Sequence, residues 1–275
     1  MKEKSNRSAC GKTLWLFGAA IVAASAMNVR ASLLVSDTFN YPTGNLVGNT
    51  PPIGGIWTAH SGAPTNPIQV ANSDSIIVNE STGVEDDHST FAGGFTAAAG
   101  DVLYSSFTIN VPVPTGTLTP VYFASFLEST SDFDSRVWVT TPATSGDGYQ
   151  IALSEASTLN ATKSVYSGDL QFGTTYTVVT SYDYTNKDGS LWIDPTSPVS
   201  PALGTTTDTG FSDAVTAYAF RQSAVTGNAI ITVGDLQVGT SLADVVVVPE
   251  PASLGIIALG GMALLRRRRR GGADH

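Results

Sequence analysis

The sequence predicts an all-β body, built as a two-sheet antiparallel β-sandwich of the jelly-roll kind, between two terminal segments of different character. Roughly a dozen short runs rich in Val, Ile, Thr and aromatic residues are separated by clusters of Gly, Pro, Asn, Asp and Ser. No amphipathic helical period occurs among them. Two sheets packed face to face bury such strands economically, and the strands are too many for a seven-stranded module.

The N-terminal segment, residues 1–31, has the layout of a secretory signal peptide. Four basic residues precede the apolar run Leu14 to Ala26, and small residues follow it. Cleavage after Ala31 is favoured because the next residues resemble the start of a strand, and cleavage after Ala26 is the alternative. The expected partner of this segment is the Sec translocon.

Composition limits what the exported body can bind. The single cysteine, Cys10, precedes the apolar run and is expected to leave with the signal peptide, so the body has no disulfide and no thiolate metal site. Between Ser32 and Leu265 there are four basic and 21 acidic residues, a net charge of −17. A body of this charge is repelled by nucleic acid and by anionic lipid, and it attracts cations.

The body, residues 32–244, is expected to be one sandwich domain. Its expected strands are short runs of alternating or continuous apolar character. In chain order they are 33–39, 56–60, 75–79, 102–111, 121–127, 136–140, 148–153, 175–184, 190–194, 215–221 and 229–238.

Three local features of the body carry specific expectations. In the run 102–111, Leu103, Ser105, Phe107 and Ile109 fall on one face, as period-two alternation requires. The residues Thr185 to Gly189 are expected to form the turn of a hairpin. The stretch 80–88, which is rich in acidic residues, is expected to be a polar loop.

Fragments of the body resemble laminin-G and concanavalin-like sandwiches of exported bacterial proteins. The first is Asp37-Thr38-Phe39-Asn40-Tyr41-Pro42 with Gly44-Asn45-Leu46, followed by Gly54 to Trp57. The others are Tyr176 to Tyr184 with the strand ending in Asp194-Pro195, and the closing run Ile231 to Val238. The resemblance implies a fold that serves glycan binders, glycoside hydrolases and structural modules alike.

The C-terminal segment, residues 245–275, consists of a proline-rich motif, an apolar run and a basic end. Its members are Pro249, Glu250 and Pro251, the run Ala252 to Leu265, and Arg266, Arg267, Arg268, Arg269 and Arg270. Two prolines so close together end the folded body, and the arginines favour the cytoplasmic face. An apolar helix over 252–265 is expected to be roughly 21 Å long, short for a full membrane span.

The order of these parts resembles the PEP-CTERM sorting signal of exported bacterial proteins. In that family an exosortase-type enzyme is thought to recognise and process the tail near the Pro-Glu-Pro. The resemblance implies a protein held in the inner membrane by its tail until it is processed. The mature protein is then expected in the cell envelope, at the cell surface or in the extracellular matrix.

Candidate binding residues are few. Glu85, Asp86 and Asp87 form a dense acidic run that is a candidate calcium site, although a solvated loop is the simpler interpretation. Trp138 is a candidate sugar-stacking residue, because Val137 and Val139 point the other way and core valines would leave the indole on the outer face. His60 and His88 are interpreted as solvated surface residues.

We therefore expect a non-enzymatic, exported envelope or matrix protein whose body is a structural or interaction module. The alternative is a carbohydrate-binding module that contacts extracellular polysaccharide, with or without calcium. A polysaccharide hydrolase is disfavoured, because the body's four glutamates lie far apart and no closely spaced carboxylate motif occurs.

Overall fold

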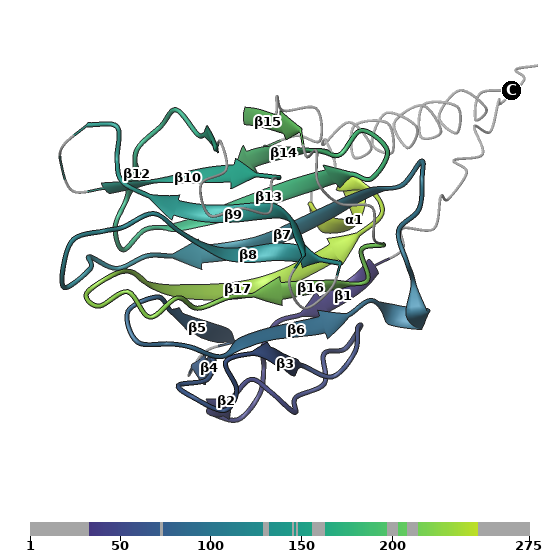
Figure 1. Ribbon diagram of the computed structural model, residues 1–275, viewed down its shortest axis with the longest axis horizontal. Coiled ribbons are helices and arrows are strands. Elements are labelled where there is room, and N and C mark those ends of the chain that lie inside the picture. Colours follow the sequence, from purple (N-terminus) through teal and green to yellow (C-terminus); the bar gives the residue numbers. More distant parts are fainter. Residues whose placement is uncertain are drawn as a thin grey trace, which may run out of the picture. The chain divides into compact units, whose positions relative to one another are not determined.

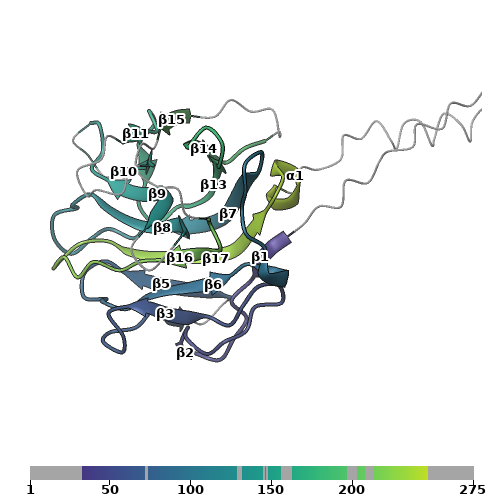
Figure 2. The same cartoon turned by 45° about the vertical axis from the view of Figure 1, so that its right-hand side comes forward.

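The computed structural model describes residues 33–71, 74–128, 132–144, 146, 148–155, 163–196, 203–207 and 214–246, which all belong to one compact unit. They form two antiparallel sheets, seen from two directions in Figures 1 and 2. The short helical turns η1 (Ala92–Gly94) and α1 (Leu242–Val245) are additions to this framework. The predicted β-sandwich is confirmed.

The first sheet has nine strands. Its order is β15 (Leu203–Thr207), β14 (Asp188–Ile193), β13 (Thr175–Asp183), β7 (Val102–Asn110), β17 (Ile230–Gly239), β5 (Ser75–Asn79), β4 (Gln69–Ala71) and β2 (Gly44–Asn45). The remaining strand, β1 (Leu33–Asp37), also pairs with β17. The first half of β17 pairs with β5 and the second half with β1, and a bulge after Gly234 separates the halves.

The second sheet has eight strands. Its order is β11 (Ser164–Val165), β10 (Gly148–Ser154), β9 (Phe133–Thr140), β8 (Val121–Leu127), β16 (Ala217–Phe220), β6 (Asp86–Thr90) and β3 (Thr58–Ser61). The short strand β12 (Leu170–Gln171) pairs with β10. This sheet and the nine-stranded sheet face each other across the core.

The core between the sheets is aromatic. Leu103, Ser105, Phe107 and Ile109 are all fully buried, which confirms the alternation predicted for β7. Phe107 meets Phe123 of the opposite sheet edge-to-face, with ring centroids 5.9 Å apart. Such contacts between large rings add to the burial energy and bring β7 and β8 together.

A second aromatic group closes the end of the core near β1. Trp57 is fully buried and its indole Nε1–H donates to Asp37 Oδ2 over 2.7 Å. The same carboxylate accepts from the Tyr41 hydroxyl at 2.8 Å and from the Phe39 amide at 2.7 Å. Burial raises the pKa of Asp37, and these three donors oppose the shift by stabilising the charged form. The fragment Asp37 to Trp57 is therefore one hydrogen-bonded unit.

Most predicted strands agree with the observed strands, but β15 and the short strands β2, β4, β11 and β12 were not predicted, and β6 lies where a loop was predicted. Residues 86–90 form a strand between β16 and β3, where the sequence predicted a polar loop. Aspartate is unfavourable in strands, so composition alone indicated a loop. Burial on both faces of the sheet overrides that preference, and Asp86, Asp87 and Ser89 are all buried.

The predicted hairpin of β13 and β14 is present, but its turn is shorter than expected. Tyr184 to Lys187 form the turn, and Gly189 already lies in β14, paired with Tyr182. A Cβ at Gly189 would lie 2.0 Å from Glu155 Oε1 and 2.7 Å from Ser135 Oγ. Glycine is needed there because the other sheet approaches its backbone closely.

The terminal signals lie outside the described residues, namely the signal peptide 1–31 and residues 247–275. The turn α1 spans the predicted domain boundary after Asp244. Within the part of the chain that the structure describes, no helix has the length and apolar character needed to cross a membrane.

Candidate functional site

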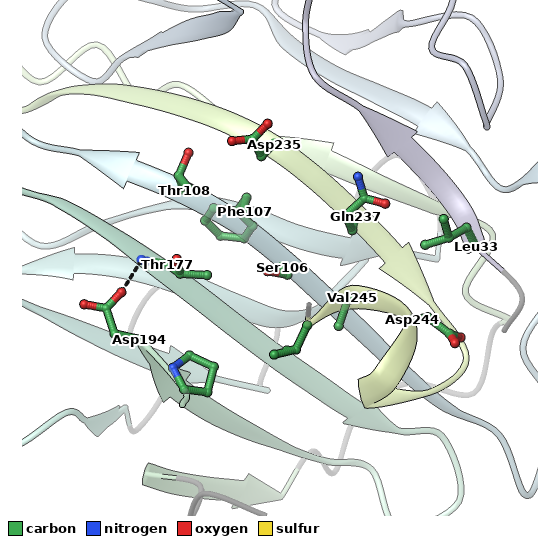
Figure 3. A pocket seen from close by; sticks show the side chains of 12 residues that line it. Leu33, Ser106, Phe107, Thr108, Thr177, Asp194, Asp235, Gln237, Asp244 and Val245 are labelled. Carbon is green, nitrogen blue, oxygen red and sulfur yellow. Dashed lines mark hydrogen bonds between the residues drawn. The ribbon is translucent and has the colours of Figure 1, made fainter. Parts of the chain in front are cut away.

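The main candidate site is a hollow of about 720 Å³ on the nine-stranded sheet (Figure 3). In β7, Ser106 and Thr108 alternate with the core residues Ser105, Phe107 and Ile109. Their side chains therefore lie on the face turned away from the other sheet. The lining consists of Leu33, Ser106, Phe107, Thr108, Thr177, Asp194, Pro195, Asp235, Gln237, Asp244, Val245 and Val246.

A bulge in β17 places a carboxylate in the hollow. Asp235 lies between Gly234 and Gln237, where the pairing with β7 shifts register. Its φ of 52° is left-handed, a conformation that aspartate tolerates better than most residues. The side chain is exposed and makes no hydrogen bond with the other residues drawn around the hollow in Figure 3. It is therefore free to bind a ligand.

The other two acids of the hollow are already engaged. Asp194 Oδ1 accepts from the Thr177 amide at 2.7 Å, the bond drawn in Figure 3. Asp244 caps α1 by accepting from the Ser241 amide at 2.9 Å and from the Ser241 hydroxyl at 2.6 Å. These bonds hold the rim in place, and each carboxylate keeps lone pairs that can accept from a ligand.

A neighbouring hollow of about 500 Å³ shares Thr108 and Asp235 with the first. Its further lining includes Asp74, Asn110, Thr175 and Thr232. The two hollows together follow the surface of β7 and β17. Among the residues that the structure describes, neither lining contains a lysine or an arginine. Hydroxyl, amide and carboxylate groups in this arrangement can form many hydrogen bonds with a polyhydroxylated ligand.

Trp138 lies on the outer face of the eight-stranded sheet, as predicted from its valine neighbours, but the expectation that it is exposed is wrong. The side chain is 2 % exposed, and its Nε1–H donates to Ser154 Oγ at 2.8 Å. The ammonium of Lys163 lies 4.2 Å from the ring centroid. The indole packs with Tyr122 and Ala152 in a small cluster separate from the main core. The ring is buried and the Lys163 ammonium lies over it, so no indole face is exposed on which a sugar could stack.

Basic side chains gather around Tyr122 and Trp138 on the outer face of the eight-stranded sheet, which the sequence alone did not predict. The guanidinium carbons of Arg136 and Arg221 lie 4.8 and 4.3 Å from the ring centroid of Tyr122. With Lys163, three of the four basic residues between Ser32 and Leu265 contact rings of this one face. Register explains the assembly, because Tyr122 and Ala152 are both direct partners of Trp138.

The candidate calcium residues are placed differently from the sequence prediction. Asp87 is the direct partner of the core residue Phe220, so it points inward, whereas its neighbour Asp86 points outward and accepts from the Gln222 amide at 2.8 Å. Burial, with Glu85 and Asp86 nearby, raises the pKa of Asp87 to about 8. Among the described residues, no three His, Cys, Asp or Glu side chains could hold a metal ion together. Strand alternation is why Glu85, Asp86 and Asp87 do not form that group.

A separate group of buried acids brings together Glu128, Asp134 and Glu155, which are distant in sequence. Ser135 donates to Glu155 through its amide at 2.6 Å and through its hydroxyl at 3.0 Å. Burial, with the carboxyl groups of Glu128 and Glu155 nearby, raises the pKa of Asp134 well above its ordinary value. A carboxyl in this environment holds a proton at neutral pH. Sequence spacing could not have shown this cluster, because pairing of β9 with β8 and β10 creates it.

Comparison with known proteins gives one matching sequence motif and several structures of similar fold. No curated protein matches the chain in sequence. The binding domain of botulinum neurotoxin DC in complex with SialylT is 10% identical, with a TM-score of 0.50 over 78% of this chain and 49% of that one. This chain thus spans about half the length of that structure.

Two further similar structures are the CBM2 module of the evolved Dit of Lactobacillus casei BL23 phage J-1 and the Emp47p carbohydrate recognition domain. The first is 10% identical, with a TM-score of 0.47 over 77% of this chain and 96% of that one. The second is 11% identical, with a TM-score of 0.44 over 77% and 98%. At the other end of the chain, residues 247–270 match the PEP-CTERM protein-sorting motif. The chain therefore joins a β-sandwich body to a PEP-CTERM sorting tail.

Proposed function

We propose that this chain is an exported protein of the cell envelope or extracellular matrix whose sandwich binds extracellular polysaccharide in the hollow of the nine-stranded sheet. The observation that carries the proposal is the polar part of the lining of that hollow: hydroxyl, amide and carboxylate groups lie beside apolar side chains, with no basic residue among the described lining residues. The role proposed for the body is binding and not catalysis.

The chemistry of the lining favours an uncharged polysaccharide. Sugar hydroxyls donate to carboxylates and exchange hydrogen bonds with Thr108, Thr177 and Gln237, all of which line the hollow. A uronic acid would instead meet Asp235 and Asp194 with no cation to balance it. Like charges brought together in this way cost binding energy, so acidic polysaccharides are expected to bind poorly.

A glycan array with and without a chelator tests this proposal. The protein is expected to bind neutral glycans equally in both conditions, and Asp235→Asn is expected to weaken binding about tenfold because a charged acceptor is lost. Asparagine tolerates the left-handed backbone at this position, so the substitution changes charge with little strain.

The matched control is Asp169→Asn, which alters another exposed aspartate, one that accepts from the Ala143 amide at 2.9 Å. It is expected to bind like the unaltered protein. Absence of glycan binding by the unaltered protein would leave a purely structural role. Calcium-dependent binding that Asp235→Asn does not affect would place the site elsewhere. Hydrolysis of a bound polysaccharide would overturn the non-catalytic role.

The sorting tail is proposed to be processed by an exosortase-type enzyme. Replacing Pro249, Glu250 and Pro251 with alanines is expected to leave a longer, membrane-held protein, because the recognition motif at residues 247–270 is broken. Immunoblotting of membrane and surface fractions measures this. A matched control replaces the Pro112-Val113-Pro114 tripeptide of the body, where Val113 is 70% exposed. Unchanged size and location of the Pro-Glu-Pro variant would show that the tail is only an anchor.

A further inference from the structure

Two histidines that are distant in sequence meet on the outer face of the eight-stranded sheet. His88 is the direct partner of Ala219, which packs in the outer cluster with Leu127 and Phe133. His60 lies in the paired strand β3, where a bulge between Ala59 and Ser61 brings it beside His88. The ring centroids are 5.3 Å apart, with the planes at 71°. The interpretation of these residues as solvated surface is therefore wrong, since both are half-buried.

Three of the four ring nitrogens of this pair have no partner in the described part of the protein, whereas His88 also makes a hydrogen bond with the Thr58 backbone. Nδ1 and Nε2 of His60 and Nδ1 of His88 are buried, and none has a hydrogen-bond partner. Buried polar atoms normally have a partner, and those without one point to an unseen water or ion.

We propose that His60 and His88 form a two-imidazole site for a late first-row divalent metal ion such as Zn²⁺. Zinc binds imidazole nitrogen at about 2.0–2.1 Å, and two rings sharing one tetrahedral ion then have centroids roughly 5 Å apart. The observed separation of 5.3 Å matches that geometry. Imidazole ligands suit zinc and its neighbours better than calcium.

The described side chains supply only these two ligands for such an ion. Among the described residues no third His, Cys, Asp or Glu side chain completes a ligand set. An ion held by two imidazoles keeps positions for water or for an oxygen of a bound molecule, as in open zinc sites. The ring of Phe133, 6.0 Å from His60, forms an apolar wall beside the pair. The site lies on the sheet opposite the glycan hollow, so the two proposals stand or fall separately.

Titration calorimetry of the detergent-purified full chain with ZnCl₂ tests this site. One ion per chain is expected to bind, and His60→Gln or His88→Gln is expected to weaken binding at least about tenfold, since one ligand is lost. The third histidine, His275, provides the matched control, and His275→Gln is expected to bind like the unaltered chain. CaCl₂ is expected to give no comparable binding.

Thermal unfolding in EDTA shows whether each variant folds. If a variant does not fold, the visible absorption of Co²⁺ added to the unaltered chain replaces the comparison, and the intense bands of a four-coordinate site with nitrogen ligands are expected. No Zn²⁺ binding by the unaltered chain, Zn²⁺ binding that persists in the His60→Gln/His88→Gln double variant, or absence of those Co²⁺ bands would overturn the proposal.

Discussion

Replacing Trp57 with alanine is expected to lower the free energy of unfolding by about 3–5 kcal/mol, the usual cost of deleting a fully buried aromatic side chain. The ring packs against Phe220 and Phe39, with centroids 5.8 and 6.0 Å away. Its indole also donates to Asp37, a carboxylate that is 1% exposed and depends on its donors. Urea unfolding followed by fluorescence or circular dichroism measures the change.

Two further substitutions separate packing from hydrogen bonding at this position. Trp57→Phe keeps most of the ring but leaves Asp37 one donor short, and it is expected to cost about 1–3 kcal/mol. Ile56→Ala alters the preceding residue, which is 56% exposed, and is expected to stay within about 0.5 kcal/mol of the unaltered protein. A Trp57→Ala variant as stable as Ile56→Ala would contradict the role assigned to this corner of the core.

The stability of the body is expected to fall as pH rises from 5 to 8. The pKa of Asp87 is raised to about 8, chiefly by burial, and that of Glu80 is also raised to about 8 for the same reason. Over this range the folded state keeps protons that the unfolded state has released, so raising the pH favours unfolding. The loss approaches about 1.4 kcal/mol per pH unit for each such group.

Urea unfolding at pH 5, 6.5 and 8 measures this slope. Asp87→Asn removes one titrating group and is expected to make the slope shallower. Asp183→Asn is the matched control: the pKa of Asp183 is lowered by its bonds to Asn186 and Thr185, so it stays ionised in both states over this range. A stability that rises from pH 5 to pH 8 would show that the buried carboxyl groups are charged and paired.

Much of the fold follows from local sequence patterns. The strand predicted at Val121–Leu127 is observed at those residues, and the alternation of β7 correctly indicates its core face. The strand β6 could not be predicted in the same way, because Asp86 and Asp87 contradict strand preference and are buried only through pairing with β16 and β3. Tertiary context decides such segments.

The candidate sites depended still more on pairing in three dimensions. Thr108, Thr177 and Asp235 are unremarkable in sequence and meet only because β7 lies between β13 and β17. His60 and His88 meet through the pairing of β3 with β6. The face of Trp138 could be predicted from its neighbours, but its burial could not, since Lys163 and Ser154 come from elsewhere in the chain. The sorting tail could be identified from the sequence because its signal is a short, continuous motif.

The most direct test of glycan binding in the hollow is the backbone amide spectrum of the isotope-labelled protein, recorded during titration with a neutral oligosaccharide selected on the array. The largest shifts are expected at β7, β13 and β17, centred on Thr108, Thr177 and Gln237, and they are expected to be much smaller in Asp235→Asn at equal ligand concentration. Shifts confined to β8, β9 and β10, or no saturable shifts at all, would contradict binding at this face.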